Sequence, residues 1–346
     1  MELPQRVIIG FHIFPEIGRI LKELHLEGSA LIVSGPNVRK IVEPPLSSAL
    51  KDKDHGFGFS WETISVSSFS ECERISYIAK ESKTSFLIGV GGGKSIDVAK
   101  LASFNSNLPF VSVPTSASHD GISSPFASVL GLRRPYSIVA KPPMAIIADI
   151  GVISSASPRL LTSGCGDLIS KKTAVRDWEL ASKRKNDYFG KYAASLAMLS
   201  ADLVLANCMS IGRRELEGVR VVVEALISAG VAAGIAGSSR PCSGSEHLFS
   251  HAMEILAPGK GLHGEKCGIG TIMMAKLHGI DHEAIREALQ EIGAPTTAKE
   301  ISATEDEVVE ALLLAGNLRK ERYTILDEAK LTSESARNLA KETRVI

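Results

Sequence analysis

The first half of the chain alternates short apolar runs with stretches whose apolar residues repeat at helical spacing. Short apolar runs that end at glycine or proline predict buried strands, and the stretches between them predict amphipathic helices. We expect strands at 6–10, 30–34, 61–66, 86–90, 110–114 and 145–149, with helices at 13–24, 71–83 and 95–103 and another that opens at Pro36. This alternation predicts a parallel sheet with helices on both faces.

The pattern changes near residue 153, where strand-like runs give way to long segments rich in Ala, Leu, Glu and Lys. Ser157-Pro158 is a typical helix start, because proline suits the first helical position. We therefore predict an α/β fold with a Rossmann-like parallel sheet domain over 1–153, an all-helical domain over 154–346, and an active site in the cleft between them. The expected helices are 158–182, 188–210, 215–236, 244–256, 265–278, 281–291 and 305–315.

Composition narrows the class of protein. Of the 346 residues, 44% are hydrophobic and 23% are charged, which is ordinary for a globular protein. Lys plus Arg and Asp plus Glu number 39 each, so no net field favours nucleic acid or a membrane surface. The longest apolar stretch, 219–236, contains Arg220 and Glu224, which predicts a buried helix and no stable membrane insertion.

The cysteines and the amino-terminal residues predict a cytoplasmic protein. The cysteines are odd in number and scattered, and none forms a Cys-x-x-Cys pair. The opening residues lack the apolar core of a secretion signal. All five cysteines are expected to be reduced: Cys72, Cys165, Cys208, Cys242 and Cys267.

Three glycines, Gly91, Gly92 and Gly93, follow a predicted buried strand and precede a predicted helix. Without Cβ atoms the backbone can approach a phosphate, and the helix start offers free N–H groups to an anion. Two other interpretations stay open: a tight turn that binds no ligand, and a kinase-type phosphate loop. The second would need glycine at position 88, where the chain has Ile88.

A polar loop follows the next predicted strand. The hydroxyls of Thr115, Ser116 and Ser118 are suited to ribose, phosphate or the nicotinamide amide. Because the carboxyl ends of parallel strands form the ligand crevice, this loop and the glycine loop are expected to face each other. The alternative is a polar loop with capping residues and no ligand.

Asp167, His247 and His263 form a candidate ligand set for one divalent metal. One carboxylate and two imidazoles fill three positions and leave space for a substrate oxygen, as catalytic sites require. His251 follows His247 by four residues and shares its helix face. Cys267 lies near one ligand and Cys165 near another, but neither is needed to complete the set, so both are expected to be buried apolar residues.

Four motifs, in order along nearly the whole chain, resemble the superfamily of iron-containing alcohol dehydrogenases, glycerol dehydrogenases and dehydroquinate synthases. These motifs occupy 91–100, 114–121, 166–168 and 263–266. Three longer strings resemble the archaeal sn-glycerol-1-phosphate dehydrogenases, at 118–125, 240–251 and 293–297.

The resemblance implies reversible reduction of dihydroxyacetone phosphate to sn-glycerol 1-phosphate, the backbone of archaeal ether phospholipids, with NAD(H) or NADP(H) in a homo-oligomer. It implies Zn²⁺ on Asp167, His247 and His263, although iron, nickel or manganese also suit such donors. It implies substrate contacts and catalytic roles for Asp120, Asp167 and His251. The implied cofactor residues are Gly91, Gly92, Gly93, Lys94, Ser95, Ile96, Asp97, Thr115, Ser116, Ala117, Ser118 and Ser124.

Several alternatives stay open from the sequence. A glycerol dehydrogenase or a dehydroquinate synthase is the near alternative, and a metal-stabilised scaffold without catalysis is a more distant one. No acidic residue follows the second strand at 34–37, and Arg39 is close by, so we predict that both NADH and NADPH serve. No dense Arg/Lys cluster lies within the motifs for the substrate phosphate, which leaves a protonated His251, a lysine or a helix start as candidates.

Overall fold

The computed structural model describes residues 2–51, 56–131 and 137–346, and its contacts divide the chain into two units. The first unit comprises residues up to 117 together with 121–156. The second comprises 157–346 together with the short segment 118–120. The loop that follows residue 114 therefore contributes residues to both units.

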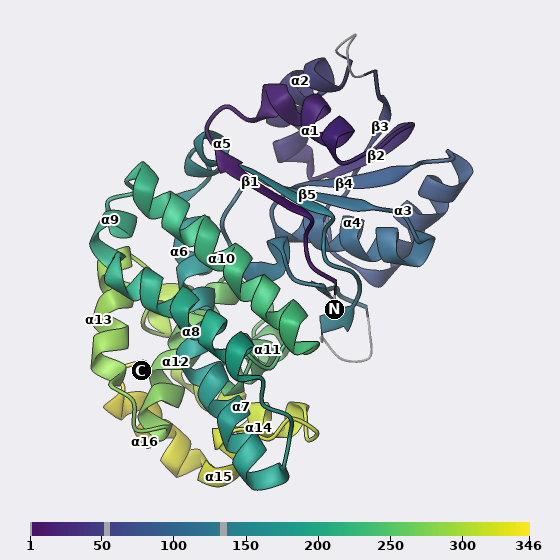
Figure 1. The fold of residues 1–346 in the computed structure, drawn as a ribbon. Coiled ribbons are helices and arrows are strands. Elements are labelled where there is room, and N and C mark those ends of the chain that lie inside the picture. Colours follow the sequence, from purple (N-terminus) through teal and green to yellow (C-terminus); the bar gives the residue numbers. More distant parts are fainter. Residues whose placement is uncertain (1, 52–55, 132–136) are drawn as a thin grey trace. The chain divides into compact units, whose positions relative to one another are not determined.

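The first unit is built on a six-stranded parallel sheet, as the alternating sequence pattern predicted (Figure 1). The strand order is β1-β8-β5-β4-β2-β3. The bounds are β1 (Arg6–Gly10), β2 (Ser29–Ser34), β3 (Gly58–Thr63), β4 (Phe86–Gly91), β5 (Phe110–Pro114) and β8 (Ala145–Asp149). Connections leave β2 and β4 toward opposite edges of the sheet, so these neighbours form the switch point at which parallel sheets bind ligands.

Helices cover both faces of this sheet (Figure 1). One apolar cluster joins the sheet to two helices through residues such as Ile17, Leu46 and Ile88. On the other face, α4 packs against β4 and β5, and α3 packs against α4. The bounds are α1 (Ile17–Glu23), α2 (Pro36–Lys51), α3 (Phe69–Glu81), α4 (Gly93–Ser106) and α5 (Ile150–Ser154), with 3-10 turns η1 (Phe14–Glu16) and η2 (Asp120–Ile122).

The sequence pattern missed some short elements. An antiparallel pair, β6 (Phe126–Ser128) and β7 (Ser137–Val139), lies outside the main sheet. The third strand begins at Gly58, earlier than the predicted residue 61. The helix predicted over 158–182 is interrupted at Ser170, where one helix ends and the next begins. Strands of three residues carry too little periodicity to be recognised from sequence.

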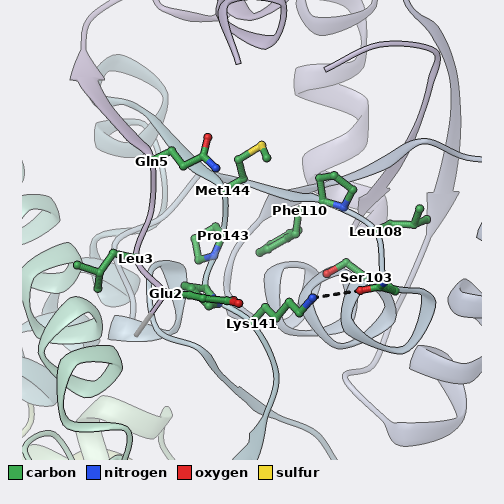
Figure 2. A pocket seen from close by; sticks show the side chains of 12 residues that line it. Glu2, Leu3, Gln5, Ser103, Leu108, Phe110, Lys141, Pro143 and Met144 are labelled. Carbon is green, nitrogen blue, oxygen red and sulfur yellow. Dashed lines mark hydrogen bonds between the residues drawn. The ribbon is translucent and has the colours of Figure 1, made fainter. Parts of the chain in front are cut away.

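A hollow of about 440 Å³ opens in the first unit at the amino ends of the strands (Figure 2). Phe110 begins β5 and Met144 precedes β8, and both line the hollow. Lys141 Nζ donates to Asn107 Oδ1 across 3.2 Å at its rim. Parallel sheets bind their ligands at the opposite, carboxyl edge, so this hollow is distinct from the predicted cofactor loops.

The described part of the second unit contains helices and one 3-10 turn. The bounds are α6 (Pro158–Ile169), α7 (Lys171–Lys185), α8 (Lys191–Ala206), α9 (Cys208–Gly212), α10 (Leu216–Ala236), α11 (Ser245–Leu256), α12 (His263–Leu277), α13 (His282–Ile292), η3 (Lys299–Ile301), α14 (Glu305–Leu318), α15 (Ile325–Ala329) and α16 (Ser333–Glu342). Helix α10 is long and apolar enough to cross a membrane, with a mean hydropathy of 1.8, but 56% of that window is buried. Its packing against α8 and α6 is that of the predicted buried helix.

Candidate active site

Glycines bring two distant helices of the second unit into backbone contact. A Cβ atom on Gly264, at the start of α12, would overlap the carbonyl oxygen of Ser163 in α6. A Cβ atom on Gly166 would likewise overlap the carbonyl oxygen of Gly264. Gly166 directly precedes the predicted ligand Asp167, and Gly264 directly follows the predicted ligand His263. The close approach of α6 and α12 therefore places the carboxylate beside the imidazole.

The structure brings the three predicted metal ligands together. One donor atom each from Asp167, His247, His263 and Cys267 lies within 4.8 Å of the others. Donors bound tetrahedrally to Zn²⁺ lie roughly 3.3–3.8 Å apart, so a small contraction of this cluster would suit the ion. The donor set fits a divalent cation. Cys267 was expected only to pack, yet its Sγ is 3.6 Å from His263 Nε2; Cys165 is buried outside the cluster.

Glu246 sets the direction in which His247 faces. The Nδ1 of His247 lies 2.8 Å from the buried Glu246 carboxylate, and Nε2 lies 3.4 Å from Asp167 Oδ1. Burial opposes a charge on His247, but Cys267 and Asp167 raise the pKa of the imidazole well above its usual value. The groups around Nε2 thus stabilise a positive charge at that nitrogen. A carboxylate on the second ring nitrogen is the usual support for a metal-bound histidine.

We expect Glu246→Gln to lower metal affinity by about 10- to 100-fold, because the neutral amide lacks the negative charge of the carboxylate and orients the ring less firmly. Competition with a chromogenic chelator would measure the affinity. Glu305→Gln, at the exposed start of α14, is the matched control and should leave it unchanged. An unaltered affinity in Glu246→Gln would remove this residue from the metal's support.

Lys171 is a site residue that the sequence interpretation missed. Its side chain is fully buried, and Nζ lies 2.8 Å from both Asp120 and Asp167. The backbone N–H of Asp120 also donates to Asp167 Oδ2 at 3.0 Å. Burial opposes the charge of Lys171, but the two carboxylates raise the pKa of its ammonium well above the usual value. Its signal was the four-residue spacing from Asp167, which puts both on one face of the continuous helix that the sequence predicted.

His251 lies beside the cluster of candidate metal ligands, here called the metal cluster, and its ring is neutral. The centroids of its ring and those of His247 and His263 are 6.5 and 6.4 Å apart. Burial, followed by the charges of His247, Arg319, Arg322 and Lys266, lowers the pKa of His251 to about 3. A protonated His251 was one candidate for the substrate phosphate. The surroundings oppose that charge, so His251 is suited to hydrogen bonding.

A buried carboxylate anchors the helix that carries both histidines. Asp177 Oδ2 accepts from the backbone N–H and the hydroxyl of Ser245, each at 2.6 Å. Its Oδ1 accepts from the N–H of Ile325 at 2.7 Å and contacts His278 Nε2 at 2.9 Å. Asp177 therefore fixes the start of α11 relative to the segment that follows α14.

In the first unit, the two predicted cofactor loops meet at the carboxyl ends of β4 and β5. The strands pair in parallel, and the N–H of Thr115 donates to the carbonyl of Gly91 at 3.0 Å. Gly91 has φ +144°, which L side chains rarely adopt. Gly92 precedes the first residue of α4, so the free N–H groups of that helix start lie at the loop. The expectation that the loops face each other is confirmed.

Two features at the start of α4 are suited to a phosphate. The buried Ser116 hydroxyl has no hydrogen-bond partner among the described residues. A Cβ atom on Gly92 would lie only 3.1 Å from that oxygen, so the glycine keeps the approach to Ser116 open. An unpaired buried hydroxyl beside free helix N–H groups is the arrangement expected where a ligand oxygen binds.

The other predicted cofactor residues differ in burial and in position. Lys94 is exposed and Ile96 is buried in the core. The buried Asp97 carboxylate accepts from Lys100 Nζ at 3.2 Å and from the N–H of Ser128 at 3.0 Å, so it holds the segment beyond the loop. Ala117 and Ser118 lie in the loop after β5, Ser95 lies in the first turn of α4, and Ser124 lies between η2 and β6.

Arg39 occupies the end of the sheet where an adenosine ribose is expected. Its guanidinium pairs with Glu43 at 2.8 Å and donates to the Thr63 hydroxyl at 3.1 Å. It also lies 5.5 Å from the centroid of the Trp61 ring. The loop after β2 is near the start of α4, because a Cβ on Gly35 would lie 3.9 Å from Ser95 Oγ. Arg39 is thus a half-buried cation at the switch point.

Solved structures share this fold. A probable glycerol dehydrogenase from Sinorhizobium meliloti superposes with a TM-score of 0.80 at 20% identity, covering 99% of this chain and 98% of its own. Glycerol dehydrogenase from Schizosaccharomyces pombe gives 0.77 at 21% identity, covering 100% and 93%. Sulfoacetaldehyde reductase from Bifidobacterium kashiwanohense, solved with NAD⁺, gives 0.74 at 18% identity, covering 99% and 97%. At this identity the likeness concerns the fold.

Sequence relatives are much closer. The family model for iron-containing alcohol dehydrogenase matches residues 8–158. A glycerol-1-phosphate dehydrogenase (NAD(P)⁺) from Nitrosopumilus maritimus is 50% identical, covering 100% of this chain and 97% of the relative. Enzymes of the same name from Sulfurisphaera tokodaii and Pyrococcus abyssi are each 47% identical over all of this chain and over 98% and 99% of their own. The chain therefore belongs to the glycerol-1-phosphate dehydrogenase family of the iron-containing alcohol dehydrogenases.

Proposed function

We propose that this protein catalyses the reversible, NAD(P)H-dependent reduction of dihydroxyacetone phosphate to sn-glycerol 1-phosphate. The observation that carries the proposal is the cluster of Asp167, His247 and His263 in a chain about half identical to enzymes of that name. The proposed product supplies the glycerol backbone of archaeal ether phospholipids.

The metal and the nicotinamide cofactor are proposed to bind different groups of residues. Asp167, His247 and His263 would hold a divalent metal, with Zn²⁺ the first choice for this donor set. The loops after β4 and β5 would hold the nicotinamide cofactor, with its pyrophosphate at the start of α4. The chemistry supplied by these groups is polarisation of the substrate's C2 carbonyl and donation of hydride.

The side chains around the cluster would orient the substrate and handle its proton. Lys171 holds the Asp120 carboxylate next to Asp167, at 2.8 Å from each. Asp120 is thereby positioned to accept a hydrogen bond from a substrate hydroxyl. His251, kept neutral by its surroundings, can donate or accept a hydrogen bond from the same substrate. In the reverse direction, the proton that leaves the C2 hydroxyl has two candidate acceptors, the Asp120 carboxylate and the neutral His251 ring.

Both NADH and NADPH are proposed to serve. Arg39 contacts Glu43 and Thr63 in the region expected for the adenosine ribose. It can turn toward a 2′-phosphate, and the residues directly after β2 include no acidic side chain that would repel one.

The first experiment follows oxidation of NADH and of NADPH with dihydroxyacetone phosphate, before and after chelation and zinc addition. We expect both cofactors to be oxidised in a metal-dependent manner. The product should not be oxidised by a stereospecific sn-glycerol-3-phosphate dehydrogenase. Strict use of NADH would contradict the cofactor proposal alone, and absence of any oxidation would contradict the function.

The same assay separates the alternatives within the superfamily. A glycerol dehydrogenase would prefer unphosphorylated dihydroxyacetone. A dehydroquinate synthase would act on a phosphorylated heptulosonate and would consume no net cofactor. The solved relatives named as glycerol dehydrogenases are about 20% identical, so they favour neither alternative over the proposed reaction.

We also propose a cytoplasmic homo-oligomer. Helix α8 exposes Tyr192, Leu199 and Leu203, spaced to lie along one side of the helix, and Tyr188 precedes it. Exposed apolar side chains gathered on one face are typical of an interface. Light scattering of the purified enzyme would give its mass, and a monomer would contradict this part of the proposal.

A further inference from the structure

Three arginines gather next to the helix that carries His247 and His251. Arg240 lies in the loop before α11, whereas Arg319 and Arg322 follow α14, and α11 packs against α14. Besides desolvation, the charges of Arg319 and Arg240 lower the pKa of Arg322 to about 9. The three guanidinium groups therefore repel one another.

Arg322 differs from the other two in its partners. Arg240 pairs with Asp187 at 2.6 Å, and Arg319 pairs with Glu321 at 2.9 Å. Arg322 is only 6% exposed, and its Nη atoms donate to the carbonyl of Ser243 at 2.5 Å and to the hydroxyl of Ser239 at 2.8 Å. Among the described residues no carboxylate lies within ion-pair distance of its guanidinium.

Glu246 and Glu321 act on Arg322 electrostatically without pairing with it. A buried cation without a paired carboxylate is unfavourable, so folded proteins rarely keep one that has no use. The two bonds hold the planar Arg322 group in one orientation. Ser243 stands two residues before α11, so this guanidinium is held at the amino end of the helix. The N–H groups of Gly244 and Ser245 at this helix start are bound by Glu246 and Asp177. The charge of the arginines is therefore what favours a further anion beside them.

The charges of two of these arginines also act on His251, which is proposed to contact the substrate. Arg319 and Arg322 both contribute to the lowered pKa of His251, whose ring lies 6.5 Å from that of His247. In dihydroxyacetone phosphate, the phosphorus is three bonds from the C2 carbon. A substrate whose C2 oxygen faces His247 and Asp167 therefore carries its dianion only a few ångströms farther on.

We propose that Arg322, supported by Arg319, binds the phosphate of the substrate and makes the enzyme select a phosphorylated triose over the free one. This inference rests on the proposed function, because it assigns the phosphate-binding part of that active site. Arginine suits the role, since its planar donors match phosphate oxygens and its charge persists at neutral pH.

The test measures kcat/KM of the zinc-loaded enzyme with dihydroxyacetone phosphate and with dihydroxyacetone. Arg322→Gln should lower the ratio of the two values by about 10- to 150-fold, the effect expected for one charged hydrogen bond. The KM for NADH should stay near the wild-type value. Inorganic phosphate serves as a second probe: it should raise the melting temperature of the wild type, and less so that of Arg322→Gln.

Arg220→Gln is the matched control, because Arg220 is an exposed arginine of the same unit that pairs with Glu224 at 2.8 Å. It should keep both the substrate ratio and the phosphate response. If Arg322→Gln fails to fold, Arg319→Gln gives the same two readouts at a half-buried position. A folded variant of Arg322, or in its place of Arg319, with an unchanged ratio and phosphate response would overturn the inference.

Failure of the proposed function looks different. Wild-type enzyme that leaves dihydroxyacetone phosphate unreduced would overturn the function. The phosphate response of the zinc-loaded protein would still decide the anion site, because it does not depend on turnover. Stabilisation by phosphate that Arg322→Gln abolishes would then support an anion site with another ligand.

Discussion

His263→Ala is expected to lose its bound metal and at least about 1,000-fold in kcat/KM while staying folded. The proposed chemistry depends on a cation that polarises the substrate carbonyl, and such stabilisation contributes several kcal/mol to the transition state. His263 begins α12, and Gly264 rather than the imidazole makes the close contact with α6. Elemental analysis of the purified variant gives its metal content, and circular dichroism gives its fold.

His282→Ala is the matched control, since His282 also begins a helix of the second unit but lies outside the metal cluster. It should keep metal and turnover. Full activity in metal-free wild-type enzyme, or in His263→Ala, would contradict the proposed mechanism. Residual metal in His263→Ala would instead indicate that Cys267, 3.6 Å from the ring, supplies the third donor.

Lys171→Met is expected to destabilise the metal-free protein by about 3–5 kcal/mol, because it leaves the Asp167 and Asp120 carboxylates without their shared buried cation. Burial opposes ionisation of Asp167, but Lys171 and His247 hold the pKa of that carboxyl well below its usual value. Its contribution is therefore present above its unfolded pKa and is lost only as pH falls through the lower folded value. The raised pKa of Lys171 keeps its contribution below its unfolded value and loses it only as pH rises through the folded one. Urea unfolding at pH 7 thus reports the full effect.

A double-mutant cycle gives the control for this experiment. Removing one negative charge with Asp120→Asn should recover part of the stability lost in Lys171→Met, because the two residues interact directly. Saturating zinc should also reduce the loss, since the metal compensates Asp167. Unfolding free energies that add without coupling would show that Lys171 does not stabilise these carboxylates.

The sequence was sufficient to predict which motif residues gather in space. The glycines before α4 and the hydroxyls after β5 were predicted to meet, and the hydrogen bond from Thr115 to Gly91 shows that they do. Asp167, His247 and His263 were predicted to share one metal, and their donor atoms lie within 4.8 Å of one another. Their roles in metal binding stay a prediction.

Residues that act through others were not apparent from the sequence. Glu246 stands next to His247 in the chain, yet only its 2.8 Å contact with Nδ1 shows that it orients the ring. Lys171 stands four residues after Asp167, but only the structure shows that it is buried between two carboxylates. Charge and spacing identify candidates, but burial decides which charges must be compensated.

By itself the sequence determined the alternation of strands and helices, the parallel sheet, the helical second half and the family. These depend on local periodicity and on short motifs, which are readable without long-range contacts. Only the tertiary structure decided the strand order, the break at Ser170, the inclusion of Cys267 in the metal cluster and the placing of Arg322 beside α11. Each of these depends on which distant segments pack together, because packing sets both the distances between side chains and the cost of leaving a buried charge alone.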